Sequence, residues 1–237
     1  MLLGPVWAGE VRVAAASNFA APMKRLAADF ETATGHRAAF SLGATGKFYA
    51  QIRNGAPFEV LLAADDETPA RLEREGLAVA GSRFVYATGR LVLWSAKPGW
   101  VDDRGEVLRG GRFEHLAVAS PKLAPYGAAA EQVLTRLGLR STLQSKLVWG
   151  ENIAQTYQFV HSGAAELGFV ALSQVGEEGR IRSGSGWIVP AQLHRPIRQE
   201  AAALTRGRDN PAVEALLRFL RSDVARGVIR SHGYDLE

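Results

Sequence analysis

The segment VRVAAASNFAAPMKRLAADFETATG, residues 11–35, contains the pattern that decides the fold. Its first six residues are an apolar run with β-branched side chains, which is typical of a buried strand. Pro22 then lies in a first helical turn, apolar residues recur at helical spacing from Met23 to Phe30, and Gly35 follows the last of them. The segment therefore predicts a strand that is followed directly by a helix.

The same strand-helix unit recurs along the chain. We expect further strands at 37–41, 60–64, 116–119, 148–149, 167–171 and 197–204, a β-like segment over 84–95, and helices at 47–53, 70–75, 126–137, 141–146, 153–162, 212–220 and 223–231. This alternation, with near-continuous apolar strands, indicates an α/β protein with parallel sheets that helices cover on both faces. The units fall into two blocks, about residues 10–86 and 90–195, and the tail after residue 197 can return to the first block.

The composition excludes several classes of function. The chain has 237 residues, of which 47% are hydrophobic and 22% charged, so it can bury a sizeable core. The net charge of +4 comes from basic residues that are scattered along the chain, so we expect no nucleic-acid partner. There is no cysteine, and the five histidines show no metal-ligand spacing, so we expect no bare metal site. No apolar stretch approaches the roughly 18 residues that a membrane span needs.

The N-terminal residues 1–9 resemble the end of a secretory signal. They are apolar, and Val6-Trp7-Ala8 matches the small-x-small pattern that precedes a cleavage site. The stretch lacks a basic start and is too short to be a whole signal. We therefore interpret it as the remnant of a signal peptide, with a plain N-terminal arm as the alternative.

Small polar residues follow the expected strands at four places, each at an expected helix N-terminus. These are Ser17-Asn18, Ala44-Thr45-Gly46, Pro125-Tyr126-Gly127 and Asn152-Ile153. Ligands bind at this edge of open α/β sheets, and the free backbone N–H groups of a helix start favour an anion. Taken alone, each of these residues fits a simple helix cap. An anion site therefore requires that several of them converge.

Three motifs suggest catalysis or cation binding, and we reject or demote each of them. The loop Gly43 to Lys47 ends like a phosphate-binding loop, but it is too short, and Phe48 replaces the hydroxyl that binds Mg²⁺. The acidic residues 65–67 lack the spacing of a calcium loop, so an acidic helix start is favoured over a cation site. Ser17 has no Gly-x-Ser-x-Gly elbow around it, which argues against a serine hydrolase.

Several segments, taken in order, resemble the molybdate-binding proteins of ABC importers. They are VAAASNFA (13–20), GATGKFYAQI (43–52), NGAPFEV (54–60) with the following strand to Asp65, APYG (124–127) and GFVALS (168–173). The resemblance runs from about residue 10 to the C-terminus, and GAPFEV and GFVALSQ are its more specific parts. It implies a class II periplasmic-binding-protein fold, in which two α/β lobes are joined by two crossover strands with a ligand cleft between them.

The resemblance also implies the positions of the lobes and of the site. One lobe would span 10–86 plus 198–237 and the other 89–195, with crossovers near 86–89 and 196–199. The family binds its oxyanion through hydroxyls, amides and backbone N–H groups, without a charged partner. Some members use a Tyr where this chain has Ala171, so here that hydroxyl would have to come from Tyr126. The matching residues are Ser17, Asn18, Thr45, Tyr126 and Ile153, with Asn152 and Ala44 as secondary candidates.

The function that follows from the resemblance is that of a transport receptor. The protein would be a periplasmic, monomeric, non-enzymatic receptor that binds molybdate or tungstate without a cofactor and delivers it to an ABC permease. The alternatives are a receptor of the same fold for sulfate, phosphate or an organic anion, an enzyme on the same scaffold, and the sensing domain of a regulator. No set of nucleophile, base and orienting group can be read from the sequence, nor can a DNA-binding segment.

Overall fold

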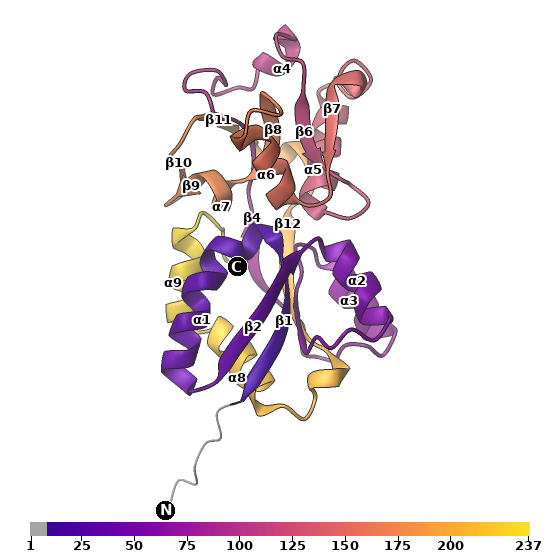
Figure 1. Ribbon diagram of the computed structural model, residues 1–237, viewed down its shortest axis with the longest axis vertical. Coiled ribbons are helices and arrows are strands. Elements are labelled where there is room, and N and C mark those ends of the chain that lie inside the picture. Colours follow the sequence, from indigo (N-terminus) through magenta and orange to yellow (C-terminus); the bar gives the residue numbers. More distant parts are fainter. Residues whose placement is uncertain (1–8) are drawn as a thin grey trace, which may run out of the picture.

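Two five-stranded sheets organise the computed structural model, which describes residues 9–237 (Figure 1). The first sheet has the strand order β2-β1-β3-β12-β4, and the second has the order β11-β5-β8-β6-β7. We call the first sheet with its helices lobe 1 and the second sheet with its helices lobe 2. The signal-peptide interpretation of residues 1–9 lies outside the described residues, apart from Gly9.

Lobe 1 is a sheet with helices on both faces. Its elements are β1 (Glu10–Ala16), η1 (Ser17–Phe19), α1 (Ala20–Thr34), β2 (Arg37–Gly43), α2 (Thr45–Arg53), β3 (Val60–Leu62), α3 (Glu67–Arg74), β4 (Phe84–Gly89), β12 (Ile197–Ala203), η4 (Thr205–Gly207), α8 (Pro211–Leu220) and α9 (Asp223–Ser231). Val11 and Val13 pack in a core with α1, α8 and α9, whereas Ala14 packs in a second core with α2 and α3. The alternation of side chains along β1 thus fills both cores.

Lobe 2 repeats this arrangement. Its elements are β5 (Leu91–Ser95), α4 (Val107–Gly110), β6 (Leu116–Ala119), α5 (Pro125–Arg136), η2 (Gln144–Lys146), β7 (Leu147–Gly150), α6 (Ile153–His161), β8 (Leu167–Ala171), α7 (Leu172–Val175), β9 (Gly176–Glu177), β10 (Arg180–Ile181), β11 (Ser185–Ile188) and η3 (Ala191–Leu193). Leu93 and Val118 pack in the core that contains α5, and Val92 and Trp94 pack in the core that contains Val160 of α6. The prediction that helices cover both faces is therefore confirmed.

The chain crosses between the lobes twice, in two segments that lie side by side. It leaves lobe 1 through β4 and enters β5 of lobe 2 after Arg90, and it returns from β11 to β12 (Figure 1). β4 and β12 are antiparallel partners, with Gly89 opposite Ile197 and a register shift between Gln199 and Glu200. These are the two crossover strands of the expected fold. The exact lobe boundaries stay a prediction.

The expectation of parallel sheets is confirmed for only part of each sheet. β1 is parallel to β2 and β3, and β6 is parallel to β7 and β8. β12, however, is antiparallel to β3 and β4, and β5 is antiparallel to β8 and β11. β5 and β12 enter their sheets directly from the other lobe, so the helical connection that makes neighbouring strands parallel is missing at both.

The expected β-like segment over 84–95 is confirmed, as two strands that belong to different sheets because the chain passes between the lobes at Arg90. The expectation of a helix over 141–146 was wrong, since the chain forms turns there and then a 3-10 helix over Gln144–Lys146. The described part of the chain contains no helix that is long and apolar enough to span a membrane.

Candidate functional site

The seven residues expected at the anion site line one small cavity between the lobes. About 190 Å³ of space, part of it open to solvent, lies between its lining residues. Lobe 1 contributes the ends of β1 and β2 and the start of α2, and lobe 2 contributes the starts of α5 and α6. The lining residues are Ala16, Ser17, Asn18, Gly43, Ala44, Thr45, Ala64, Ala124, Pro125, Tyr126, Asn152 and Ile153. The fold thus brings all seven candidates together, and their role as ligands stays a prediction.

Backbone N–H groups at three helix starts are available in this cavity. Helix α2 begins at Thr45, two residues before its expected start, and α6 begins at Ile153. Across residues 9–237, the N–H groups of Thr45, Tyr126 and Ile153 donate to no protein acceptor. Gly46, the next residue of α2, donates its N–H to the carbonyl of Leu123 at 2.9 Å. The N–H groups left over are therefore donors for an anion, and the helix dipoles favour its charge.

Two hydroxyl groups also face the anion cavity from lobe 1. The Thr45 side chain is buried, and its Oγ1 accepts a hydrogen bond from the N–H of Ala64 at 3.0 Å. This bond leaves the proton of the Thr45 hydroxyl free to be donated. Ser17 is buried too, and its hydroxyl has no protein partner within the described residues. Buried hydroxyl groups normally form hydrogen bonds, and each of these two has a proton that it can still donate. Both hydroxyls are therefore suited to a ligand that accepts hydrogen bonds.

The Asn18 side chain is held by hydrogen bonds to other protein groups. Its Nδ2 donates to Oε1 of Gln199 at 2.9 Å and to the hydroxyl of Tyr234 at 3.0 Å, so both of its N–H bonds are used away from the anion. The Asn18 carbonyl accepts from Tyr234 at 2.7 Å and from Ser173 at 2.8 Å. Asn18 can therefore reach an anion only through its backbone N–H, at the start of η1.

The two secondary candidates are both N-cap residues of helices. Asn152 is the N-cap of α6, and its Oδ1 accepts from the N–H of Gln155 at 3.0 Å. Ala44 is the N-cap of α2, and its carbonyl accepts from Lys47 and Phe48. The simple capping role that the sequence left open is therefore the role that the Asn152 side chain has.

Tyr126 extends from the start of α5 to the junction of the lobes. Its hydroxyl oxygen accepts from Nε2 of Gln199 at 3.2 Å. Gly89 makes room for it, because a Cβ atom at Gly89 would lie 2.1 Å from the Tyr126 hydroxyl. Burial raises the pKa of Tyr126 well above its ordinary value, so the phenol stays neutral and keeps its proton. Ala171 at the end of β8 has no hydroxyl to offer.

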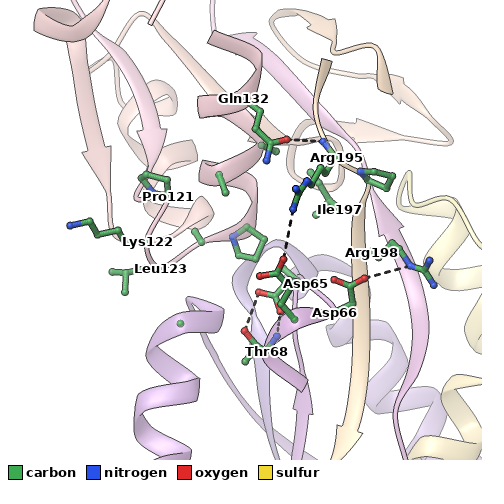
Figure 2. Close-up of a pocket in the computed structure, with 18 residues that line it drawn as sticks. Asp65, Asp66, Thr68, Pro121, Lys122, Leu123, Gln132, Arg195, Ile197 and Arg198 are labelled. Carbon is green, nitrogen blue, oxygen red and sulfur yellow. Dashed lines mark hydrogen bonds and ion pairs between the residues drawn. The ribbon is translucent and has the colours of Figure 1, made fainter. Parts of the chain in front are cut away.

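A larger groove lies beside the cavity and, unlike the cavity, is lined by charged side chains (Figure 2). It carries the carboxylates of Asp65 and Asp66 from lobe 1, Arg195 from the segment before β12, and Arg198 from β12. Asp65 accepts hydrogen bonds from the N–H of Thr68 at 2.8 Å and from its hydroxyl at 3.1 Å, and burial raises the pKa of Asp65 to about 6. The groove therefore carries charges of both signs, whereas the side chains that line the small cavity are uncharged.

The acidic residues 65–67 thus form a helix start, as the sequence favoured. Within the described residues there is no group of His, Asp or Glu side chains that could hold a metal ion. The small cavity is lined by neutral side chains throughout. The cavity therefore offers a ligand hydroxyl and N–H donors, but no charged side chain.

Sequence reasoning missed the buried residues that connect the two lobes behind the cavity. These are Tyr86, Ser173, Gln199 and Tyr234, which are linked to Asn18 and Tyr126 by hydrogen bonds. Gln199 lies between the charged residues Arg198 and Glu200 at the start of β12, so nothing in the local sequence marked it as a buried polar residue. Nothing in the sequence marked Tyr234, because its partners are far away along the chain.

Comparison with known proteins shows the family. Residues 11–235 match the family described as bacterial extracellular solute-binding protein. The molybdate-binding protein ModA of Azotobacter vinelandii is 60% identical over 97% of this chain and 91% of its own length, and ModA of Rhodobacter capsulatus is 50% identical over 98% and 91%. The solved structure of an Azotobacter vinelandii periplasmic molybdate-binding protein superposes with a TM-score of 0.91 at 42% identity, over 96% of this chain and 99% of that one. The fold is that of class II periplasmic binding proteins, and the chain belongs to the bacterial extracellular solute-binding protein family.

Proposed function

We propose that this protein is a periplasmic receptor that captures molybdate or tungstate and delivers it to an ABC permease, without catalysing a reaction. The observation that carries the proposal is the convergence of uncharged donors from both lobes on one cavity. The names of its 60% and 50% identical relatives support molybdate as the ligand. In this proposal the protein acts as a monomer, with residues 10–86 plus 198–237 as one lobe and 89–195 as the other.

The donors explain how a dianion is held without an ion pair. The hydroxyls of Ser17 and Thr45 and the N–H groups of Thr45, Tyr126 and Ile153 satisfy its oxygens from opposite sides. A cavity closed to water strengthens these bonds. Its fixed size selects against a smaller tetrahedral ion such as sulfate, which leaves donors unpaired.

Two contacts between the lobes near the cavity support the inference that the described arrangement is the closed form of the receptor. Gly46 of lobe 1 donates its N–H to Leu123 of lobe 2, and Lys47 Nζ lies 2.6 Å from the Glu151 carboxylate. Ligand binding would shift an equilibrium between open and closed forms toward this arrangement, because only the closed form offers donors from both lobes.

A titration of the purified protein with molybdate tests the proposal. We expect tight, saturable binding of molybdate and tungstate in calorimetry, with weak or no binding of sulfate and phosphate. Ser17→Ala and Thr45→Ala should each weaken molybdate binding about 10- to 150-fold, because a hydrogen bond to a charged group contributes about 1.5 to 3 kcal/mol. Thr32→Ala is the matched control, since the Thr32 hydroxyl bonds the Ala28 carbonyl on the exposed side of α1.

The same titration separates the alternatives. Preferential binding of sulfate would identify a receptor of the same fold for another oxyanion. Unchanged molybdate affinity in both alanine variants would contradict the assignment of the site.

The ion pair across the cavity mouth should have a small, salt-dependent effect on molybdate affinity. The side chains of Lys47 and Glu151 are about half exposed, so Glu151→Gln should weaken binding no more than about fivefold at low ionic strength. Calorimetry should show that the effect disappears at an ionic strength of about 1 M, where screening is strong. Asp29→Asn is the control, because it removes an exposed ion pair with Arg25 inside lobe 1. An effect that persists at high salt would contradict this role.

A further inference from the structure

Gln199 uses both ends of its side chain at the junction of the lobes. It lies on β12 and is fully buried. Its Oε1 accepts from Nδ2 of Asn18 at 2.9 Å and from the hydroxyl of Tyr86 at 3.0 Å, and its Nε2 donates to the hydroxyl of Tyr126 at 3.2 Å. One carboxamide therefore connects a cavity residue of lobe 1 to a cavity residue of lobe 2.

The direction of these hydrogen bonds follows from the network around Tyr234. The Tyr234 hydroxyl has a single proton to donate. Two acceptors share this proton, the backbone carbonyl of Asn18 at 2.7 Å and Oγ of Ser173 at 3.0 Å. Toward the Asn18 side chain it can only accept, so the Asn18 group that faces it is the amide NH₂. The same NH₂ then faces Gln199, whose carbonyl oxygen must accept from it. Consequently the NH₂ of Gln199 faces Tyr126.

These hydrogen-bond directions determine whether the Tyr126 hydroxyl acts as a donor or as an acceptor. Its oxygen accepts from Gln199, so its proton must be donated to another acceptor. Burial keeps that proton on the phenol, because it raises the pKa of Tyr126 well above the ordinary value. The Asn18 side chain also lies within hydrogen-bonding reach of the Tyr126 hydroxyl. Tyr126 lines the anion cavity as well, and there the charged oxygens of a bound oxyanion would be stronger acceptors than a neutral amide.

We propose that Gln199 is a positioning residue, which fixes Tyr126 as a hydrogen-bond donor to a fully deprotonated oxyanion. The inference rests on the proposed function, since it needs an anion in the cavity. The local backbone supports it, because β12 shifts register against β4 directly after Gln199. Gly89 supports it as well, since a Cβ atom there would lie 2.1 Å from the Tyr126 hydroxyl and 2.7 Å from Gln199 Nε2.

Gln199→Glu tests the direction of the hydrogen bond, because it changes the chemistry but hardly the shape. An ionised carboxylate accepts from Tyr126 and turns its proton away from the anion, whereas a protonated carboxyl donates to Tyr126 as the amide does. Burial raises the pKa of such a carboxyl. The titratable and charged groups around this position are Asp65, Tyr86, Tyr126, Arg198, Glu200 and Tyr234.

We expect the molybdate dissociation constant of Gln199→Glu, divided by that of the unmodified protein, to depend on pH. The ratio should be about 10 to 150 near pH 8, for the loss of a hydrogen bond to a charged group, and it should fall severalfold toward pH 6. The unmodified protein is titrated at each pH as the reference, so that its own pH dependence cancels. A ratio that is near 1 or constant from pH 8 to 6 would overturn the proposal.

Two further variants separate positioning from a merely structural role. Gln199→Met keeps the size but removes the hydrogen bonds, so its affinity loss should be independent of pH and should not add to that of Tyr126→Phe. If the affinity losses of Gln199→Met and Tyr126→Phe are additive, the proposal is overturned, even if Gln199→Glu does not fold.

Tyr86→Phe removes the other hydrogen-bond partner of Gln199 Oε1. It should lower the unfolding temperature and keep the molybdate affinity within about threefold, because it leaves the bond between Gln199 and Tyr126 in place. Absence of molybdate binding by the unmodified protein would instead reject the proposed function.

Discussion

Gly46→Val is expected to weaken molybdate binding about 100-fold and to leave the unliganded protein fully folded. A Cβ atom at Gly46 would lie 3.1 Å from Cα of Leu123, 3.2 Å from its carbonyl oxygen and 3.3 Å from the carbonyl oxygen of Lys122. These atoms belong to lobe 2, so the clash opposes the contact between lobes and not the packing of lobe 1. Overpacking costs typically about 1 to 3 kcal/mol, and the upper end applies to a β-branched side chain against backbone. Affinity falls because the closed form becomes less populated.

Calorimetry and thermal unfolding together check this expectation. The dissociation constant should rise while the unfolding temperature without ligand stays within a few degrees of that of the unmodified protein. Gly227→Val is the control, because a Cβ atom at this helical glycine of α9 would meet nothing within 4 Å. Unchanged affinity of Gly46→Val would show that binding does not require the contact between Gly46 and Leu123.

Gly127→Ala is expected to damage the fold of lobe 2 and the site together. Gly127 lies in the first turn of α5, and a Cβ atom there would lie 2.1 Å from the carbonyl oxygen of Ala119 and 3.0 Å from the carbonyl carbon of Ser120. Both are backbone atoms at the end of β6, so α5 must move away from the sheet and take Tyr126 with it. We expect a loss of about 3 kcal/mol in the free energy of unfolding, the upper end for overpacking.

Thermal unfolding without ligand measures this loss directly. For a chain of this size, about 3 kcal/mol lowers the unfolding temperature by roughly 6 to 12 °C. Gly110→Ala in α4 is the control within the same lobe, since a Cβ atom there would meet nothing within 4 Å. An unfolding temperature equal to that of the unmodified protein would show that the close approach of α5 to β6 is not needed. Gly46→Val thus tests the closure of the lobes on the ligand, and Gly127→Ala tests the folding of lobe 2.

The local pattern predicted most of the helices and strands and the place of the cavity. Ser17 and Thr45 follow the ends of β1 and β2, which are parallel neighbours, so their approach is a consequence of the sheet. Periodicity also placed Tyr126 and Ile153 at helix starts, where the structure has them. Only the resemblance predicted that Ser17 and Thr45 face Tyr126 and Ile153 across a cleft.

What could not be predicted depends on pairs of residues that are far apart along the chain. The hydrogen bonds from Asn18 to Gln199 and to Tyr234 span 181 and 216 residues. Asn18 alone has the composition of a cap or a ligand, and only the folded chain shows that its amide is used elsewhere. The antiparallel entry of β12 has the same origin, because no local pattern reveals which sheet a returning strand will join.

The uncharged lining of the cavity has an electrical consequence. The lining contains no carboxylate or imidazole that could take up a proton as the anion binds, so the full charge of a bound dianion would add to that of the protein. The formal net charge of the full chain is +4, so the loaded receptor would carry +4 − 2 = +2. Empty and loaded molecules would therefore migrate at different speeds in an electric field.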